Sequence, residues 1–128
     1  MPPIDVAVGI IKNNDGLLLI TQRRSNTHLA GLWEFPGGKR EAGETWQQAL
    51  NRELDEEIGI TVTASKHLLD TTHQYDEKHV QLSFWRVTAY TGEAYGREGQ
   101  LHRWVNIADL SQYEFPVANQ AILPFLSA

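Results

Sequence analysis

Three glutamates, Glu53, Glu56 and Glu57, are crowded into a short segment that is otherwise well suited to form a helix. Residues three and four positions apart are neighbours on a helix, and each like-charged pair costs roughly 0.2–0.5 kcal/mol. A bound multivalent cation would offset this repulsion, because hard divalent cations prefer carboxylate oxygens. The alternative is a solvated acidic face with ordinary ion pairs, in which Arg52 could hold Glu56 in place. The three carboxylates together favour a metal site.

Local signals define both ends of this helix. Thr45 and Gln48 have the spacing of a capping box, in which each side chain bonds to the other residue's backbone N–H. Gly59 stands where a left-handed residue commonly ends a helix. An apolar stripe repeats every fourth residue and must face the core: Trp46, Leu50, Leu54 and Ile58. The three glutamates overlap the edge of this stripe and are therefore expected to point toward a cleft.

Length and composition predict one domain over residues 1–128, with enough chain for a real core. The absence of cysteine favours a reducing compartment, and we expect a cytoplasmic protein without a signal peptide. No apolar stretch approaches the roughly 20 residues needed to cross a bilayer, so no membrane association is expected. A net charge of −5 argues against a nucleic-acid polymer as the partner. A small phosphorylated ligand carried with its metal ion remains compatible.

The rest of the chain reads mainly as strands and turns, which with one central helix predicts a mixed α/β domain. Residues 6–11 are typical of a buried strand, and Asn13 to Gly16 form a hairpin turn to a partner strand at 17–20. Alternation over residues 80–85 predicts a half-buried strand. Residues 31–35 and 102–105 are expected to form short strands. Residues 107–110 are expected to form one helical turn, and residues 118–126 a terminal helix that is interrupted near Pro124.

Gly37 and Gly38 interrupt the chain just before the helix. Glycine allows the backbone to approach another group closely, so we expect a ligand or metal ion to lie near them. The following Lys39 does not make a phosphate-binding P-loop, since Arg40 stands where that motif requires Ser or Thr.

The segment from Gly38 to Ile60 resembles the Nudix box at every restricted position. The box reads Gly, five residues, Glu, seven residues, and then Arg-Glu-apolar-any-Glu-Glu-any-Gly-apolar. The matching residues are Gly38, Glu44, Arg52, Glu53, Leu54, Glu56, Glu57, Gly59 and Ile60. The resemblance implies an α/β/α sandwich with a mixed central sheet, and an enzyme that hydrolyses nucleoside diphosphate-linked compounds with a divalent metal, Mg²⁺ with Mn²⁺ as a substitute.

The resemblance also assigns metal ligands and catalytic groups. It implies that Glu53, Glu56 and Glu57 bind the metal together with a backbone carbonyl near Gly37, while Glu44 fixes the junction between loop and helix. Glu98 on its own is typical of a solvated loop glutamate. Its setting, Glu98-Gly99-Gln100, resembles the loop of the MutT group of Nudix hydrolases that delivers a further catalytic glutamate, as a metal ligand or as the general base.

Other segments resemble the MutT group in order and spacing over nearly the whole chain, including residues 7–11, 34–39 and 115–119. The resemblance implies hydrolysis of 8-oxo-dGTP to 8-oxo-dGMP and pyrophosphate, which keeps oxidised guanine out of DNA. We expect the protein to be a monomer. Gly31-Leu32-Trp33 also occurs in relatives that act on pyrimidine triphosphates. The alternatives are therefore another nucleoside triphosphate, such as a modified CTP, a nucleotide sugar, or a noncatalytic recognition module.

Four residues are expected to bind the nucleotide. Asn119 could pair with a purine edge through its carboxamide, or could instead cap a helix; the resemblance favours the base. Arg23 matches a nucleotide-binding arginine, and arginine is well suited to phosphate. His28 is a weaker match. Phe35, with Ile4, could form a wall of the base pocket or belong to the ordinary core.

Overall fold

The computed structural model describes residues 3–23, 30–75 and 78–126. Its elements, in chain order, are β1 (Ile4–Ile11), β2 (Leu18–Gln22), β3 (Trp33–Glu34), β4 (Gly37–Lys39), α1 (Trp46–Ile58), β5 (Thr61–Tyr75), β6 (Lys78–Thr91), β7 (His102–Val105), η1 (Ile107–Gln112), α2 (Val117–Gln120) and η2 (Leu123–Phe125).

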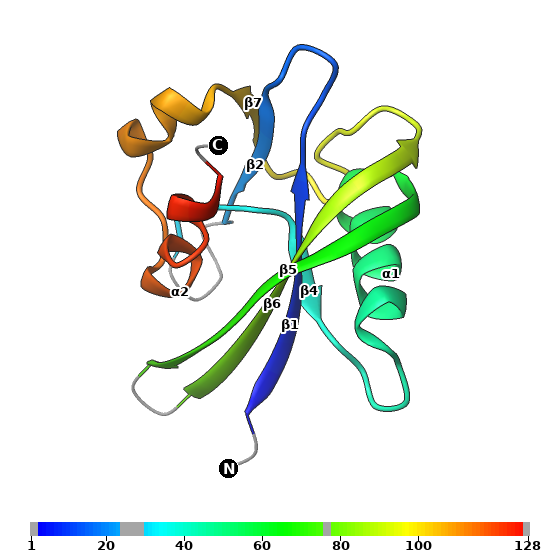
Figure 1. Ribbon diagram of the computed structural model, residues 1–128, viewed down its shortest axis with the longest axis vertical. Helices are drawn as coiled ribbons and strands as arrows, with labels where there is room; N and C mark the ends of the chain where they lie inside the picture. The colour runs from blue at the N-terminus through cyan, green and yellow to red at the C-terminus, as the bar shows by residue number, and fades with distance from the viewer. Residues whose placement is uncertain (1–2, 24–29, 76–77, 127–128) are drawn as a thin grey trace.

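A four-stranded sheet in the order β4-β1-β6-β5 forms the centre of the molecule. β1 runs parallel to β6 and antiparallel to β4, while β5 and β6 form a long antiparallel hairpin. The sheet is therefore mixed, as expected. α1 covers one of its faces, and the short helices η1, α2 and η2 lie on the other side (Figure 1).

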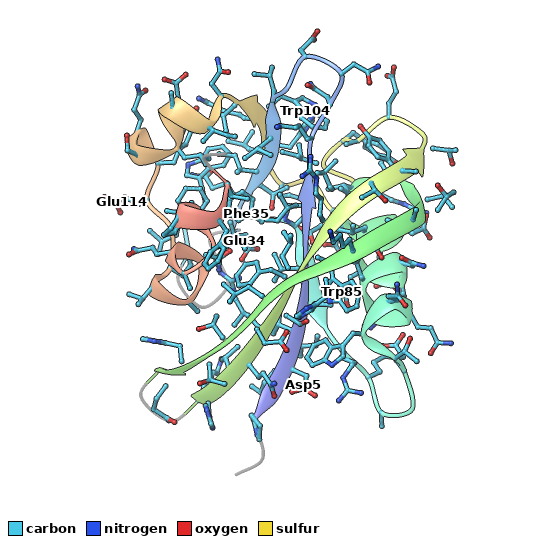
Figure 2. All side chains as sticks on the ribbon, in the orientation of Figure 1. Asp5, Glu34, Phe35, Trp85, Trp104 and Glu114 are labelled. Carbon is cyan, nitrogen blue, oxygen red and sulfur yellow. The ribbon has the colours of Figure 1, made fainter. Side chains whose placement is uncertain are left out.

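Each face of the central sheet has its own apolar cluster. On β1, Ala7 and Ile11 pack toward α1, whereas Val8 and Ile10 pack toward Phe35 and the C-terminal segment. The apolar run in β1 thus follows from burial on both sides. Figure 2 shows Trp85 on the α1 side and Phe35 on the opposite side. This layering confirms the expected sandwich.

The predicted helix is confirmed at both ends. Thr45 and Gln48 form the capping box, and Gly59 ends the helix at φ 72°. Leu50, Leu54 and Ile58 are fully buried. The helix boundary could be read from the sequence because every one of these signals is local.

One strand assignment was wrong, and another was correct but too short. Residues 17–20 do not pair along the preceding strand: apart from one bridge between Lys12 and Leu18, β2 pairs with β3 and β7 in a second, three-stranded sheet. The strand predicted over residues 80–85 is confirmed as part of the longer β6, but its burial does not alternate, because Ser83 is buried between Leu82 and Phe84. The helical layers on both sides of the sheet account for this burial.

The predicted helix over residues 118–126 is instead split into α2 and η2, with Pro124 inside η2. Proline cannot donate the hydrogen bond that would continue an α-helix. Among the helices in the described residues, none is long and apolar enough to cross a membrane.

Candidate active site

Two adjoining pockets open beside the N-terminal end of β4. The larger, about 290 Å³, is mainly apolar; its lining includes Ile4, Val6, Val8, Phe35, Val80, Leu82, Ala118 and Asn119. The smaller, about 140 Å³, is lined by Gln22, Arg23, Glu34, Gly37, Glu53, Glu57, Glu98 and Gln100. Arg23, Glu34 and Gly37 belong to both linings. An apolar cleft therefore continues directly into an acidic pocket.

α1 places two of its three glutamates in the acidic pocket. Glu53 and Glu57 are four residues apart, which puts them on one face of the helix, and both line the pocket. Glu56 lies at the side, with a side chain 53% exposed, and is not part of the pocket lining. The predicted trio is thus divided into two inward carboxylates and one at the rim.

Glu57 is the most enclosed of these carboxylates. Its Oε1 accepts a hydrogen bond from the Thr21 hydroxyl at 3.2 Å, and its Oε2 accepts one from the Gly37 N–H at 3.0 Å. Burial, followed by the nearby charge of Glu34, raises the pKa of Glu57 to about 8. Both hydrogen-bond donors are neutral groups, so the negative charge that Glu57 would carry is left for another cation to balance.

Arg52, which is not part of the pocket lining, balances several of the nearby carboxylates. Its guanidinium donates to both oxygens of Glu44, at 2.7 and 2.9 Å, and to Glu53 at 2.8 Å, with a longer contact to Glu56 at 3.4 Å. The hydrogen bond from Arg52 is the main cause that lowers the pKa of Glu44 to about 2. Arg52 also donates to the Lys39 carbonyl. The expected Arg52–Glu56 contact is confirmed, but the stronger partners are Glu44 and Glu53.

Glu44 lies where the loop enters α1, just before the N-cap residue Thr45. Its Oε1 also accepts a hydrogen bond from the Glu41 N–H at 2.8 Å, which ties the loop to this junction. Burial raises the pKa of Glu53 despite the contact with Arg52. Glu98 comes from the loop between β6 and β7 and is the third predicted carboxylate to line the pocket.

The donor set of the acidic pocket fits a hard divalent cation. Carboxylates from α1, β3 and the loop that carries Glu98 surround one small space, together with Gly37. In the part of the chain that the structure describes, no three Asp, Glu or His side chains are arranged to hold a metal ion as they stand. Arg52 holds one oxygen of Glu53, at 2.8 Å. Glu53, Glu56, Glu57, Glu98 and the Gly37 carbonyl therefore remain predicted ligands.

The apolar cleft is built around Phe35, which stacks on Phe115 with ring centroids 5.3 Å apart. Asn119 lies within α2 and is buried, so it is not the helix cap; Pro116 occupies that position. The Asn119 Oδ1 accepts a hydrogen bond from the Phe35 N–H at 3.4 Å. Because a backbone N–H can only donate, this contact fixes the orientation of the carboxamide.

Arg23 lies between the two pockets and forms a 2.7 Å ion pair with Glu34. Ile4 also lines the apolar cleft, as expected. His28 lies outside the described residues. Phe35, Arg23 and Asn119, which are far apart in sequence, are thus brought to one cleft.

Sequence reasoning missed three residues of the acidic pocket and its support: Thr21, Glu34 and Gln100. Glu34 has a side chain only 20% exposed, and burial raises its pKa despite the ion pair with Arg23. A glutamate between Trp33 and Phe35 was an available signal, since charged residues are rarely buried without a partner. Thr21 carried no such signal, because a threonine in a strand is ordinary.

Comparisons with known proteins agree with this geometry. A family model described as "NUDIX domain" matches residues 7–124. The 8-oxo-dGTP diphosphatase of Escherichia coli K12 is 40% identical over 123 residues, which cover 96% of this chain and 95% of that protein. The CTP pyrophosphohydrolase of the same organism is 35% identical over 128 residues, covering 100% and 92%.

Solved structures give the same result. One from work on the MutT proteins of Aliivibrio salmonicida and Vibrio cholerae is 44% identical, covers 98% of this chain and 97% of the other, and superposes with a TM-score of 0.84. The family match, the similarity over the full length and the two joined pockets lead to one conclusion: this chain is a member of the NUDIX domain family.

Proposed function

We propose that this protein hydrolyses 8-oxo-dGTP to 8-oxo-dGMP and pyrophosphate and so removes an oxidised precursor from the nucleotide pool. The observation that carries the proposal is the direct continuation of an apolar cleft into an acidic pocket, with Arg23, Glu34 and Gly37 shared between them. One substrate can therefore place a flat base in the cleft and its phosphates beside the carboxylates.

The base would be recognised by Phe35 and Asn119. Phe35 offers an aromatic wall, and the orientation of Asn119 leaves its Nδ2 group to donate toward an acceptor on the base. Oxidised guanine presents carbonyl oxygens as such acceptors. The Asn119 Oδ1 has a second lone pair, so pairing with two atoms of a purine edge stays compatible with the contact to Phe35.

The triphosphate would lie along Arg23 and the acidic pocket. Bound Mg²⁺, or Mn²⁺ in its place, supplies charge neutralisation and lowers the pKa of a coordinated water. Glu53, Glu56, Glu57, Glu98 and the Gly37 carbonyl are the groups of this chain that would hold it. Glu98, as general base, would accept the proton of the water that attacks the β-phosphorus, while Arg23 orients the phosphate chain.

The ligand is a free nucleotide rather than a nucleic-acid polymer, since the chain carries a net charge of −5. The relatives support the substrate class: those described as 8-oxo-dGTP diphosphatases include the 40% identical Escherichia coli protein and a 42% identical protein of Haemophilus influenzae.

A second candidate substrate is CTP or a modified CTP. It is supported by the 35% identity to a CTP pyrophosphohydrolase over the whole chain. A noncatalytic recognition module is less consistent with the sequence, because every glutamate of the Nudix box is present.

The deciding measurement is kcat/KM for 8-oxo-dGTP, dGTP and CTP with Mg²⁺, together with identification of the released product. We expect a large preference for the oxidised purine and release of pyrophosphate. A preference for CTP would retain the hydrolase and reject the proposed substrate. Glu53→Gln is the matched variant; it should keep the fold and lose most turnover, and wild-type activity in it would reject its role.

A further inference from the structure

The Gln100 side chain connects two acidic residues of the candidate active site through their backbones. Its Oε1 accepts a hydrogen bond from the Glu98 N–H at 3.0 Å, and its Nε2 donates to the Glu57 carbonyl at 3.0 Å. Gln100 also lines the acidic pocket together with both glutamates. One amide group therefore spans the distance from the loop that carries Glu98 to the helix that carries Glu57.

The surroundings show why such a connection is useful. Glu98 is exposed and lies between Gly96 and Gly99, and Gly99 adopts a φ of 87°. Glycine gives a chain more conformational freedom than any other residue. Holding the backbone beside such a carboxylate restricts the positions that the carboxylate can take.

The C-terminal end of α1 provides the fixed point. The last carbonyls of a helix have no partner within it, and three of them receive donors from this loop. The Arg97 guanidinium donates to the Asp55 carbonyl at 2.9 Å. Tyr95 N donates to the Ile58 carbonyl at 3.1 Å, and Arg97 N donates to the Glu57 carbonyl at 3.0 Å. Gln100 adds the side-chain bond that continues this attachment to the backbone of Glu98.

We propose that Gln100 is a positioning residue, which sets the Glu98 carboxylate relative to Glu57 by joining the Glu98 N–H to the Glu57 carbonyl. The inference rests on the proposed hydrolysis and deepens it, since it assigns the placement of the predicted general base to a side chain that never needs to touch the substrate. Outer groups that orient functional ligands typically contribute 10- to 100-fold to activity or metal affinity when replaced.

The test uses Gln100→Met, which keeps the length of the side chain and removes both hydrogen bonds. We expect kcat for the preferred nucleotide to fall roughly 10- to 100-fold, with KM changed less than about twofold, because the cleft that binds the base is intact. Gln112→Met is the matched control. Gln112 is exposed on η1 and makes one weak side-chain contact, to Asp109 at 3.4 Å; its kcat should equal that of wild type.

Two further measurements separate positioning from simple support of the fold. In a Glu98→Gln background, Gln100→Met should lower the residual kcat by less than about threefold, because residues that act as one unit are not additive. In the metal-free protein, amide hydrogen exchange at Glu98 should become about five- to tenfold faster in Gln100→Met, as expected for the loss of one hydrogen bond.

The possible failures are distinguishable. A wild-type protein that hydrolyses no nucleoside triphosphate would overturn the proposed function. Three other outcomes would overturn only the role of Gln100, provided that the wild type is active. These are an equally active Gln100→Met, a full additive loss of kcat in the Glu98→Gln background, and unchanged amide exchange at Glu98.

Discussion

Glu57 concentrates the electrostatic cost of the candidate site in one side chain. Its carboxylate lies below the protein surface and faces the charge of Glu34. Among the described residues, its hydrogen-bond donors are the neutral Thr21 hydroxyl and Gly37 N–H. Burial of an ionised carboxylate is unfavourable unless a cation balances it. The raised pKa therefore means that the metal-free protein keeps a proton on Glu57 at neutral pH.

This proton has a measurable effect on stability. The folded pKa of about 8 exceeds the ordinary glutamate value of 4.5, so between these values the folded state binds one more proton than the unfolded chain. The Glu57 contribution is present in full below pH 4.5 and is lost as pH rises through 8, at up to about 1.4 kcal/mol per pH unit.

Glu57→Gln should remove this dependence. In EDTA, we expect the free energy of unfolding of Glu57→Gln, relative to wild type, to increase by roughly 2 kcal/mol between pH 6 and pH 8. Urea unfolding at both pH values gives the difference. Parallel pH profiles for the two proteins would show that Glu57 is already ionised at neutral pH in the folded state.

Asn119 should determine base preference more than catalysis. Asn119→Ala removes a carboxamide that lines the apolar cleft, and a well-placed polar pair with a base is worth about 1–3 kcal/mol of discrimination. We expect the kcat/KM ratio of 8-oxo-dGTP to dGTP to fall roughly 5- to 150-fold, with pyrophosphate still released. Val117→Ala, at an exposed position on the same helix, is the control. An unchanged ratio would leave Asn119 only its contact with Phe35.

A site residue could be predicted where the pattern that marks it lies within one segment of the sequence. Glu53 and Glu57 could be found because their spacing on one helix is readable from the sequence. Other features depend on segments that meet only in the folded chain. They are the position of Glu56 at the rim, the burial of Glu34 and the two hydrogen bonds of Gln100. Repulsion among the glutamates was attributed to a missing cation, yet Arg52 offsets part of it through Glu53 and Glu56.

At the scale of elements, β4 lies at the edge of the central sheet and contacts α1, and its two glycines allow two different close approaches. A Cβ on Gly37 would lie 2.0 Å from the Ala7 carbonyl oxygen, so the close pairing of β4 with β1 needs a glycine there. A Cβ on Gly38 would lie 2.1 Å from a Glu53 carboxylate oxygen. Gly37 therefore allows β1 to approach β4 closely, and Gly38 allows the Glu53 side chain to do so. The sequence had suggested only the approach of a ligand or metal ion.

Alanine at these two positions should have separable effects. Gly38→Ala meets only the end of a flexible side chain, so we expect little change in thermal stability but at least a tenfold loss of kcat as Glu53 is displaced. Gly37→Ala meets backbone and should destabilise the protein by roughly 1–3 kcal/mol. Melting temperatures and kcat of both variants provide the test. A fully active Gly38→Ala would show that Glu53 does not need its present position.

The elements themselves were foreseen unevenly. α1 was predicted from capping and periodicity, and the strand at residues 102–105 was predicted with its bounds. β4 was read as an interruption, because glycine is depleted in strands and only its pairing with β1 makes one here. The place of β2 in a second sheet could not be predicted for a related reason, since strand pairing is not local. The turn at Asn13 to Gly16 shows that the chain reverses there, but not which sheet the next strand joins.

At the scale of the whole molecule, the acidic pocket lies where separate parts of the chain meet. β2 and the residue after it contribute Gln22 and Arg23, β3 contributes Glu34, and β4 contributes Gly37. The remaining carboxylates come from α1 and from the loop between β6 and β7. A cation held there would bind the second sheet, the edge of the central sheet and α1 at once. Its binding is therefore linked to global unfolding rather than to the order of one loop.

Mg²⁺ or Mn²⁺ should accordingly raise the melting temperature, and the increase should depend on pH. A ligand that binds only the folded state adds RT ln(1 + [L]/Kd), about 2.7 kcal/mol at 100 times Kd. Because the cation must displace the proton of Glu57, its affinity should increase as pH rises toward 8. Thermal melts with and without Mn²⁺ at pH 6.5 and 8.5 should thus show the larger shift at pH 8.5. Glu57→Gln should lose most of the shift at both values, while Glu41→Gln, at an exposed site ahead of α1, should keep it. A shift that is equal at both pH values and survives in Glu57→Gln would place the cation outside this pocket.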